Sequence, residues 1–101
     1  VVARLRDGSI PKGDALAVAR IAGIQAAKRT PEFIALAHVI GVHGVQIDIQ
    51  VTDRGVEITG TVRTADRTGV EMEALTAVSV AALNVVDMVK GLDRRAAIRD
   101  V

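Results

Sequence analysis

The clearest pattern along the chain is an alternation of apolar and polar residues between residues 45 and 62. The apolar positions follow a period of two on either side of a polar break: Val45, Ile47, Ile49 and Val51, then Val56, Ile58 and Val62. Asp53-Arg54-Gly55 between them has the composition of a tight turn. The pattern therefore predicts a β-hairpin with one apolar face. Gly60 interrupts the second strand and predicts either a bulge or the close approach of another element.

Two longer segments have helical spacing. Residues 15–28 are rich in Ala and Gly, follow the N-cap candidate Asp14, and end before Pro31. Residues 69–90 carry apolar side chains at intervals of three and four, and Thr68 and Glu71 have the spacing of a capping box. The small side chains of the first segment predict that another element packs against it at short range.

Shorter signals complete the expected order. Residues 1–6 predict a helix that stops at Asp7-Gly8-Ser9, and Pro31 predicts a short helix through Leu36. Residues 96–101 predict a final edge strand. The sum is an α+β fold, with helices packed on one face of an antiparallel sheet.

Composition places these elements in one domain. The chain has 101 residues, half of them apolar, which allows a single core. Phe33 is the only aromatic residue, so the core must be built from small aliphatic side chains at short distances. A core of this kind predicts a chain that needs a second copy to bury enough surface. We expect at least a dimer.

Charge and residue usage exclude several functional classes. Thirteen basic and 12 acidic side chains give a net charge of +1, too balanced for a binder of nucleic acid driven by bulk charge. The near absence of aromatics removes the platform on which single strands stack. With no Cys there is no disulfide, thiolate metal site or Cys nucleophile. No uninterrupted apolar run has the length of a membrane span, and no signal peptide is recognised, so we expect a cytoplasmic protein.

A few polar residues have spacings that allow chemistry. Lys12 lies two residues before the N-cap candidate Asp14, where an anion is favoured, although a solvated loop lysine is the alternative. Asp87 and Lys90 lie three apart on one side of a helix, either as a surface ion pair or as part of a polar strip with Glu73 and Asn84.

The two histidines carry weaker signals. His38 lies in an apolar stretch and has the character of a structural residue, and His43 that of a loop residue. Neither has useful metal-ligand spacing, so we expect no metal and no cofactor.

Longer blocks of sequence add a resemblance. Lys12-Gly13-Asp14, residues 19–30, residues 67–77 and the run Asp87-Met88-Val89-Lys90 resemble the cyclic pyranopterin monophosphate synthase family of molybdenum cofactor biosynthesis. The resemblance covers nearly the whole chain, and residues 67–77 are its most specific part. It implies a ferredoxin-like fold and a homohexamer built as a trimer of dimers, with active sites shared between subunits.

The same resemblance implies a lyase activity. The family converts a cyclised dihydro-GTP intermediate into cyclic pyranopterin monophosphate and releases pyrophosphate. Lys12, Asp87 and Lys90 match its catalytic positions. Two segments match its substrate-binding positions: Leu36, Ala37 and His38, and Glu71, Met72 and Glu73.

The chain also departs from the family pattern. Leu36-Ala37-His38-Val39 stands where family members usually read Leu-Cys-His-Pro, and Val86 replaces an aromatic residue. Residues 1–101 also lack the family's N-terminal segment and its C-terminal Lys-Ser-Gly-Gly loop, so we expect a single family domain without these two segments. These departures leave a second hypothesis open, a non-catalytic member that serves as an oligomeric scaffold or ligand-binding module.

Overall fold

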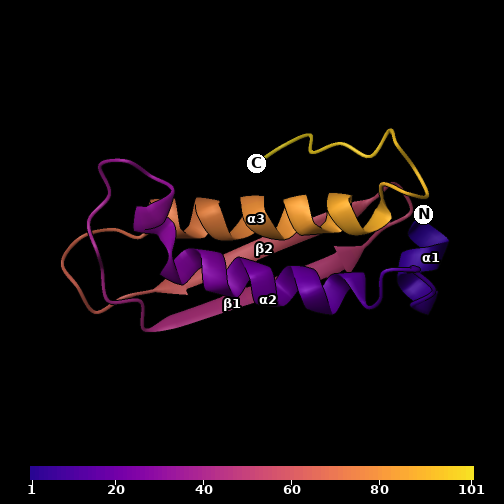
Figure 1. The fold of residues 1–101 in the computed structure, drawn as a ribbon. Helices are drawn as coiled ribbons and strands as arrows, with labels where there is room; N and C mark the ends of the chain where they lie inside the picture. Colours follow the sequence, from indigo (N-terminus) through magenta and orange to yellow (C-terminus); the bar gives the residue numbers. More distant parts are fainter.

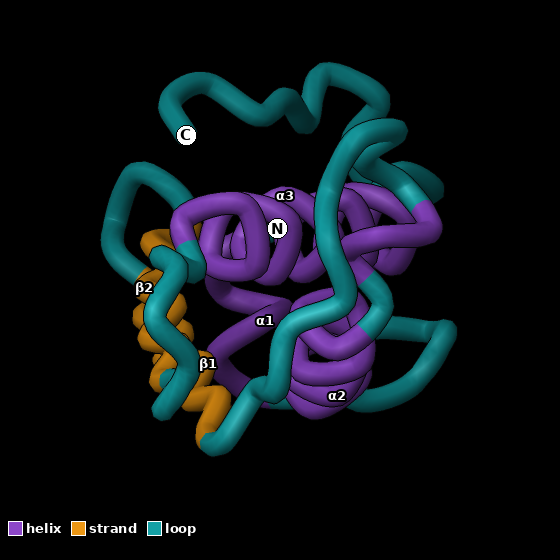
Figure 2. The backbone as a smooth tube through the Cα atoms, turned by 90° about the vertical axis from the view of Figure 1, so that its left-hand side faces the viewer, coloured by secondary structure: helices purple, strands orange, loops and turns teal.

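The computed structural model describes residues 1–101 as four helical elements and one hairpin (Figure 1). The elements are α1 (Val2–Asp7), α2 (Ala15–Lys28), the 3₁₀ helix η1 (Thr30–Glu32), β1 (Gly44–Val51), β2 (Val56–Arg63) and α3 (Glu71–Val89). The long helices α2 and α3 pack side by side over one face of the antiparallel hairpin (Figures 1 and 2). The predicted α+β fold is confirmed. The order α2-β1-β2-α3 is the inner part of the β-α-β-β-α-β ferredoxin-like motif.

The hairpin pairs residue for residue from Val51 and Val56 to Gly44 and Arg63. Gly60 lies opposite Ile47 in this register, so the strand has no bulge there. A Cβ atom at Gly60 would lie 2.8 Å from Cγ1 of Val78 on α3. The glycine therefore marks a close approach, the second of the two alternatives that the sequence predicted.

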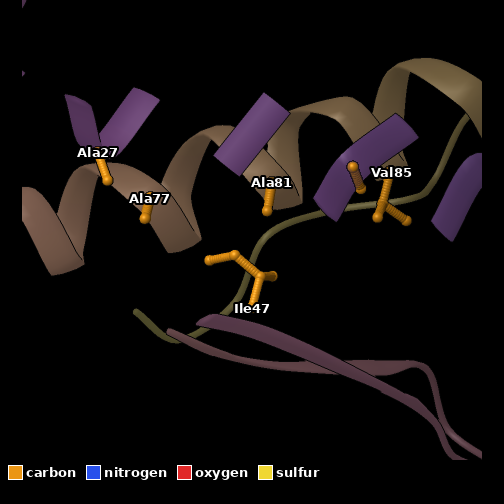
Figure 3. Close-up of a cluster of buried hydrophobic side chains, with 6 residues drawn as sticks. Ala27, Ile47, Ala77, Ala81 and Val85 are labelled. Carbon is orange, nitrogen blue, oxygen red and sulfur yellow. The ribbon is translucent and has the colours of Figure 1, made fainter. Parts of the chain in front are cut away.

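The main core is built mostly from small side chains. Its six buried residues come from α2, β1 and α3 (Figure 3): Ala19, Ala27, Ile47, Ala77, Ala81 and Val85. A Cβ atom at Gly23 would lie 2.9 Å from the carbonyl oxygen of Ala77, so α2 meets α3 almost backbone to backbone. The predicted short-range contact of α2 is thus confirmed, and its partner is α3 of the same chain.

A second cluster of buried side chains lies at the end of the molecule that holds α1. It joins α1, the turn before α2 and the last turn of α3 through five residues: Leu5, Ile10, Ala15, Met88 and Val89. The expected stop of the first helix is confirmed, because Gly8 caps α1 in the left-handed conformation at φ 75°. The Asp14 N-cap is confirmed as well, since its side chain accepts a hydrogen bond from the backbone N–H of Ala17 at 3.1 Å.

Three local predictions are wrong: the start of one helix, the end of another, and the final strand. The capping box at Thr68 does not form: α3 begins at Glu71, its N-cap is Val70, and no side chain caps it. The first turn instead holds two acidic residues, Glu71 and Glu73, at the end of the helix where the dipole favours such residues. The helix opened by Pro31 ends at Glu32 and does not reach Leu36.

The third error is the final strand. Residues 96–101 are irregular, and the sheet has two strands. Ala96 packs against the second cluster, whereas Ile98 and Val101 are exposed, so this segment finds neither a strand partner nor much apolar packing.

By length and composition alone α3 would be able to cross a membrane, but core helices of soluble proteins have the same length and composition. Here it supplies six of the 15 buried residues of the chain. Its length and apolar character are thus used in packing against α2 and the hairpin.

Candidate functional site

The structure brings Lys12, Asp87 and Lys90 together at one end of the molecule. Nζ of Lys90 lies 2.8 Å from Oδ1 of Asp87, and Nζ of Lys12 lies 3.5 Å from Oδ2 of the same carboxylate. Lys12 also donates a hydrogen bond to the backbone carbonyl of Asp87 at 3.2 Å. All three side chains are about half exposed. Two ammonium groups thus flank one carboxylate on an accessible surface.

Local sequence explains why these groups meet. Because α2 and α3 run antiparallel, the start of α2 lies beside the end of α3 (Figure 1). Lys12 lies in the turn that leads into α2, where Gly13 has a φ of 120° that favours glycine. Asp87 and Lys90 are one helical turn apart at the end of α3. The cluster therefore depends on the pairing of two helices and not on one segment.

Electrostatics fix the charge of the central carboxylate. The hydrogen bond from Lys90, together with the positive charges of Lys12 and Lys90, lowers the pKa of Asp87 below its ordinary value of 3.8. The carboxylate is therefore ionised at neutral pH and serves as an acceptor that orients its neighbours. The cluster keeps one net positive charge, which suits it to phosphate groups.

The lowered pKa gives a testable result. Since the pKa of Asp87 is lower in the folded chain, its contribution to stability is present above its unfolded value and is lost as the pH falls through the folded value. We expect Lys90→Ala to raise the pKa of Asp87 towards 3.8, because it removes the largest cause of the shift. Side-chain carboxyl titration by NMR measures this. An unchanged pKa would contradict the ion pair, and Arg95→Ala is the control at the same end of the chain.

The predicted substrate-binding residues lie at the opposite end. Leu36, Ala37 and His38 are in the loop after η1, and Glu71, Met72 and Glu73 form the first turn of α3. Leu36 is 91% exposed and His38 is also exposed, whereas Glu73 is 2% exposed on the core side of α3. The structure thus places both segments at one end, with one carboxylate packed inward.

Of the two alternatives for Asp87 and Lys90, the structure shows the surface ion pair and not a polar strip along α3. Glu73 and Asp87 are fourteen positions apart, about 21 Å at the helical rise per residue. Glu73 is buried, Asn84 donates its side-chain N–H to the carbonyl of Val80, and only Asp87 and Lys90 form a pair. Glu73 and Asp87 have similar angular positions around α3, but they lie far apart along the helix axis. The nine predicted site residues therefore form two groups at opposite ends of one chain.

Two cavities open at the end that holds Leu36–His38 and the start of α3. The larger, of about 510 Å³, is lined by Gly44, Val45, Gln46, Thr61 and Arg63. The smaller, of about 140 Å³, is lined by Ile24, Lys28, Val42, His43, Gly44 and Val45. None of the predicted site residues lines either cavity. His43, interpreted from the sequence as a loop residue, lines the smaller cavity, and its side chain accepts a hydrogen bond from the backbone N–H of Ala65, 22 positions away, a contact that leaves no signal at short spacing.

Comparisons with known proteins match the whole length of the chain to one family. A family model described as MoaC family matches residues 1–101. A protein of Streptomyces coelicolor named cyclic pyranopterin monophosphate synthase is 67% identical over 101 residues, and one of Streptomyces griseus with the same name is 63% identical. Cyclic pyranopterin monophosphate synthase 2 of Mycobacterium tuberculosis H37Rv is 58% identical over 101 residues. Each match covers all of this chain and 59%, 57% and 60% of the relative, respectively.

Proposed function

Because the chain belongs to the MoaC family, we propose that its protein is a cyclic pyranopterin monophosphate synthase of molybdenum cofactor biosynthesis. The reaction is the conversion of a cyclised dihydro-GTP intermediate into cyclic pyranopterin monophosphate with loss of pyrophosphate, without a cofactor, in the cytoplasm. The observation that carries the proposal is the cluster in which Lys12 and Lys90 flank Asp87. The chain spans less than two thirds of the length of these relatives, so the proposal concerns the whole protein.

The cluster supports specific roles. A triphosphate substrate needs cations, and the ammonium groups of Lys12 and Lys90 supply them on an accessible surface. Formation of the cyclic phosphate requires proton transfers, which we assign to these two lysines. Asp87 orients both, because its two carboxylate oxygens face one ammonium group each.

We further propose that the active site is shared between two copies of the chain. The catalytic group and the substrate-binding segments lie at opposite ends of a molecule 43 Å long, too far apart for one small substrate. A second copy can supply the missing half, as in a symmetric dimer. Exposed apolar side chains on the long helices support such assembly: Val18, Ile21, Leu75 and Leu83. The expected complete assembly is a hexamer, a trimer of dimers.

Mixing two inactive variants tests the shared site. In a hybrid of Lys90→Ala and His38→Ala subunits, one of the two sites combines an intact catalytic end with an intact binding end. Equal mixing should therefore restore about a quarter of the parent turnover of the cyclised nucleotide, while each variant alone stays inactive. If hybrids of confirmed composition regained no activity, the shared site would be contradicted.

One observation favours the alternative of a non-catalytic scaffold. Val39, which stands where the family usually has Pro, is 90% exposed, and Leu36 in the same loop is 91% exposed. This loop is therefore held by few contacts of its own side chains. Binding of the cyclised nucleotide to the parent protein without turnover would select the scaffold, and pyrophosphate release would select the lyase.

A further inference from the structure

The loops on either side of the hairpin are joined by a set of short hydrogen bonds. Nδ1 of His43 accepts from the backbone N–H of Ala65 at 3.0 Å. Oδ2 of Asp66 accepts from the backbone N–H of Gly41 at 2.7 Å. The hydroxyl of Thr64 donates to the carbonyl of Gly41 at 2.6 Å and accepts from the N–H of Asp66 at 3.0 Å. We call His43, Thr64 and Asp66 the latch.

The latch extends the hairpin beyond its last ladder pair. The backbone N–H of His43 donates to the carbonyl of Arg63 at 2.8 Å, next to the pair of Gly44 with Arg63. Beyond this point the hydrogen bonds between the two loops all involve the latch side chains.

Each latched loop leads to one proposed substrate-binding segment. His38 precedes His43 by five residues, and Glu71 follows Asp66 by five residues. The exposed loop that carries Leu36–His38 has little packing of its own, as the exposure of Leu36 and Val39 shows. Its position relative to the first turn of α3 therefore depends on the latch.

We propose that the latch holds the two substrate-binding segments in register, which makes His43 a positioning residue for the proposed reaction. The inference rests on the proposed function. His43 lies outside both buried clusters, so its loss leaves the packing of α2, α3 and the hairpin intact. The cluster of Lys12, Asp87 and Lys90 lies at the other end of the chain and is not disturbed. Loss of the latch thus weakens binding of substrate and transition state equally, which raises KM and leaves kcat unchanged.

The experiment compares His43→Ala with His43→Asn in the assembled full-length protein. The Asn side-chain oxygen can accept from Ala65 N–H in place of Nδ1, whereas Ala offers no acceptor. We expect His43→Ala to raise KM about tenfold at constant kcat, and His43→Asn to return KM to near the parent value. Gln50→Ala is the matched control, because Gln50 is exposed on the adjoining strand β1 and lines neither cavity.

A second readout does not depend on activity. Amide hydrogen exchange at Ala65 should be faster in His43→Ala and close to the parent rate in His43→Asn and Gln50→Ala. If His43→Ala kept both the kcat and the KM of the parent, the positioning role of the latch would be overturned and the proposed function would stand. Loss of kcat in His43→Ala, or failure of Asn to restore KM, would also overturn the positioning role. A parent that neither binds nor turns over the cyclised nucleotide overturns the proposed function and with it the positioning role.

Discussion

Replacing Lys90 with alanine is expected to abolish formation of cyclic pyranopterin monophosphate, with a loss on the order of a thousandfold in kcat. The change removes the ammonium group 2.8 Å from Asp87 and leaves Lys12 as the only cation on that carboxylate. In the proposed mechanism Lys90 neutralises phosphate and moves a proton, and water at the same position does neither. Product formation from the cyclised nucleotide, measured by chromatography, gives the result.

The assembly should not change in the same variant. Lys90 is 60% exposed and lies outside both buried clusters, so sedimentation should give the parent oligomer. Arg54→Ala is the matched control, since Arg54 is an exposed cation in the hairpin turn and forms no ion pair. Activity of Lys90→Ala within about threefold of the parent would remove Lys90 from the proposed mechanism.

Gly23→Leu should give the largest loss of stability, about 3 kcal/mol in the free energy of unfolding. A Cβ atom at Gly23 meets the carbonyl oxygen of Ala77 at 2.9 Å and Cβ of Ala81 at 3.2 Å. The oxygen belongs to the backbone of α3, so it cannot move without displacing the helix. A leucine therefore separates α2 from α3 and opens the core around Ile47.

Chemical denaturation monitored by circular dichroism measures this change. Gln25→Leu adds the same side chain two residues away on the exposed side of α2, and we expect it to change stability by less than about 0.5 kcal/mol. Equal effects of the two substitutions would show that the contact between Gly23 and Ala77 does not limit the packing.

The sequence predicted the hairpin and the two long helices better than the start of α3 and the last segment of the chain. The alternation from Val45 to Val62 defined the hairpin because its period cannot be satisfied by a helix. The start of α3 was wrong by two residues, since Thr68 and Glu71 have capping spacing but Val70 is the N-cap. The expected final strand at residues 96–101 failed because strand formation depends on a partner edge, which local pattern does not contain.

The candidate site was predictable only in part. The family motifs pointed to Lys12, Asp87 and Lys90, and the structure brings these three together across 75 residues of sequence. Of the two alternatives for Asp87 and Lys90, the polar strip that includes Glu73 does not form, because Glu73 is buried. The latch had no signal at all, since its hydrogen bonds join loops 22 to 25 residues apart.

The contact of Ile47 with two glycines has a thermodynamic consequence. Its Cδ1 atom lies 3.4 Å from where a Cβ of Gly23 would be and 3.6 Å from that of Gly60, so one large side chain fills the space between helices and sheet. Of the 15 buried residues, seven are Ala or Gly, which expose little apolar surface when the chain unfolds. The heat capacity of unfolding per residue should therefore lie below the usual value of about 12–15 cal/mol/K. The free energy of unfolding then varies weakly with temperature, giving this chain a shallow stability curve.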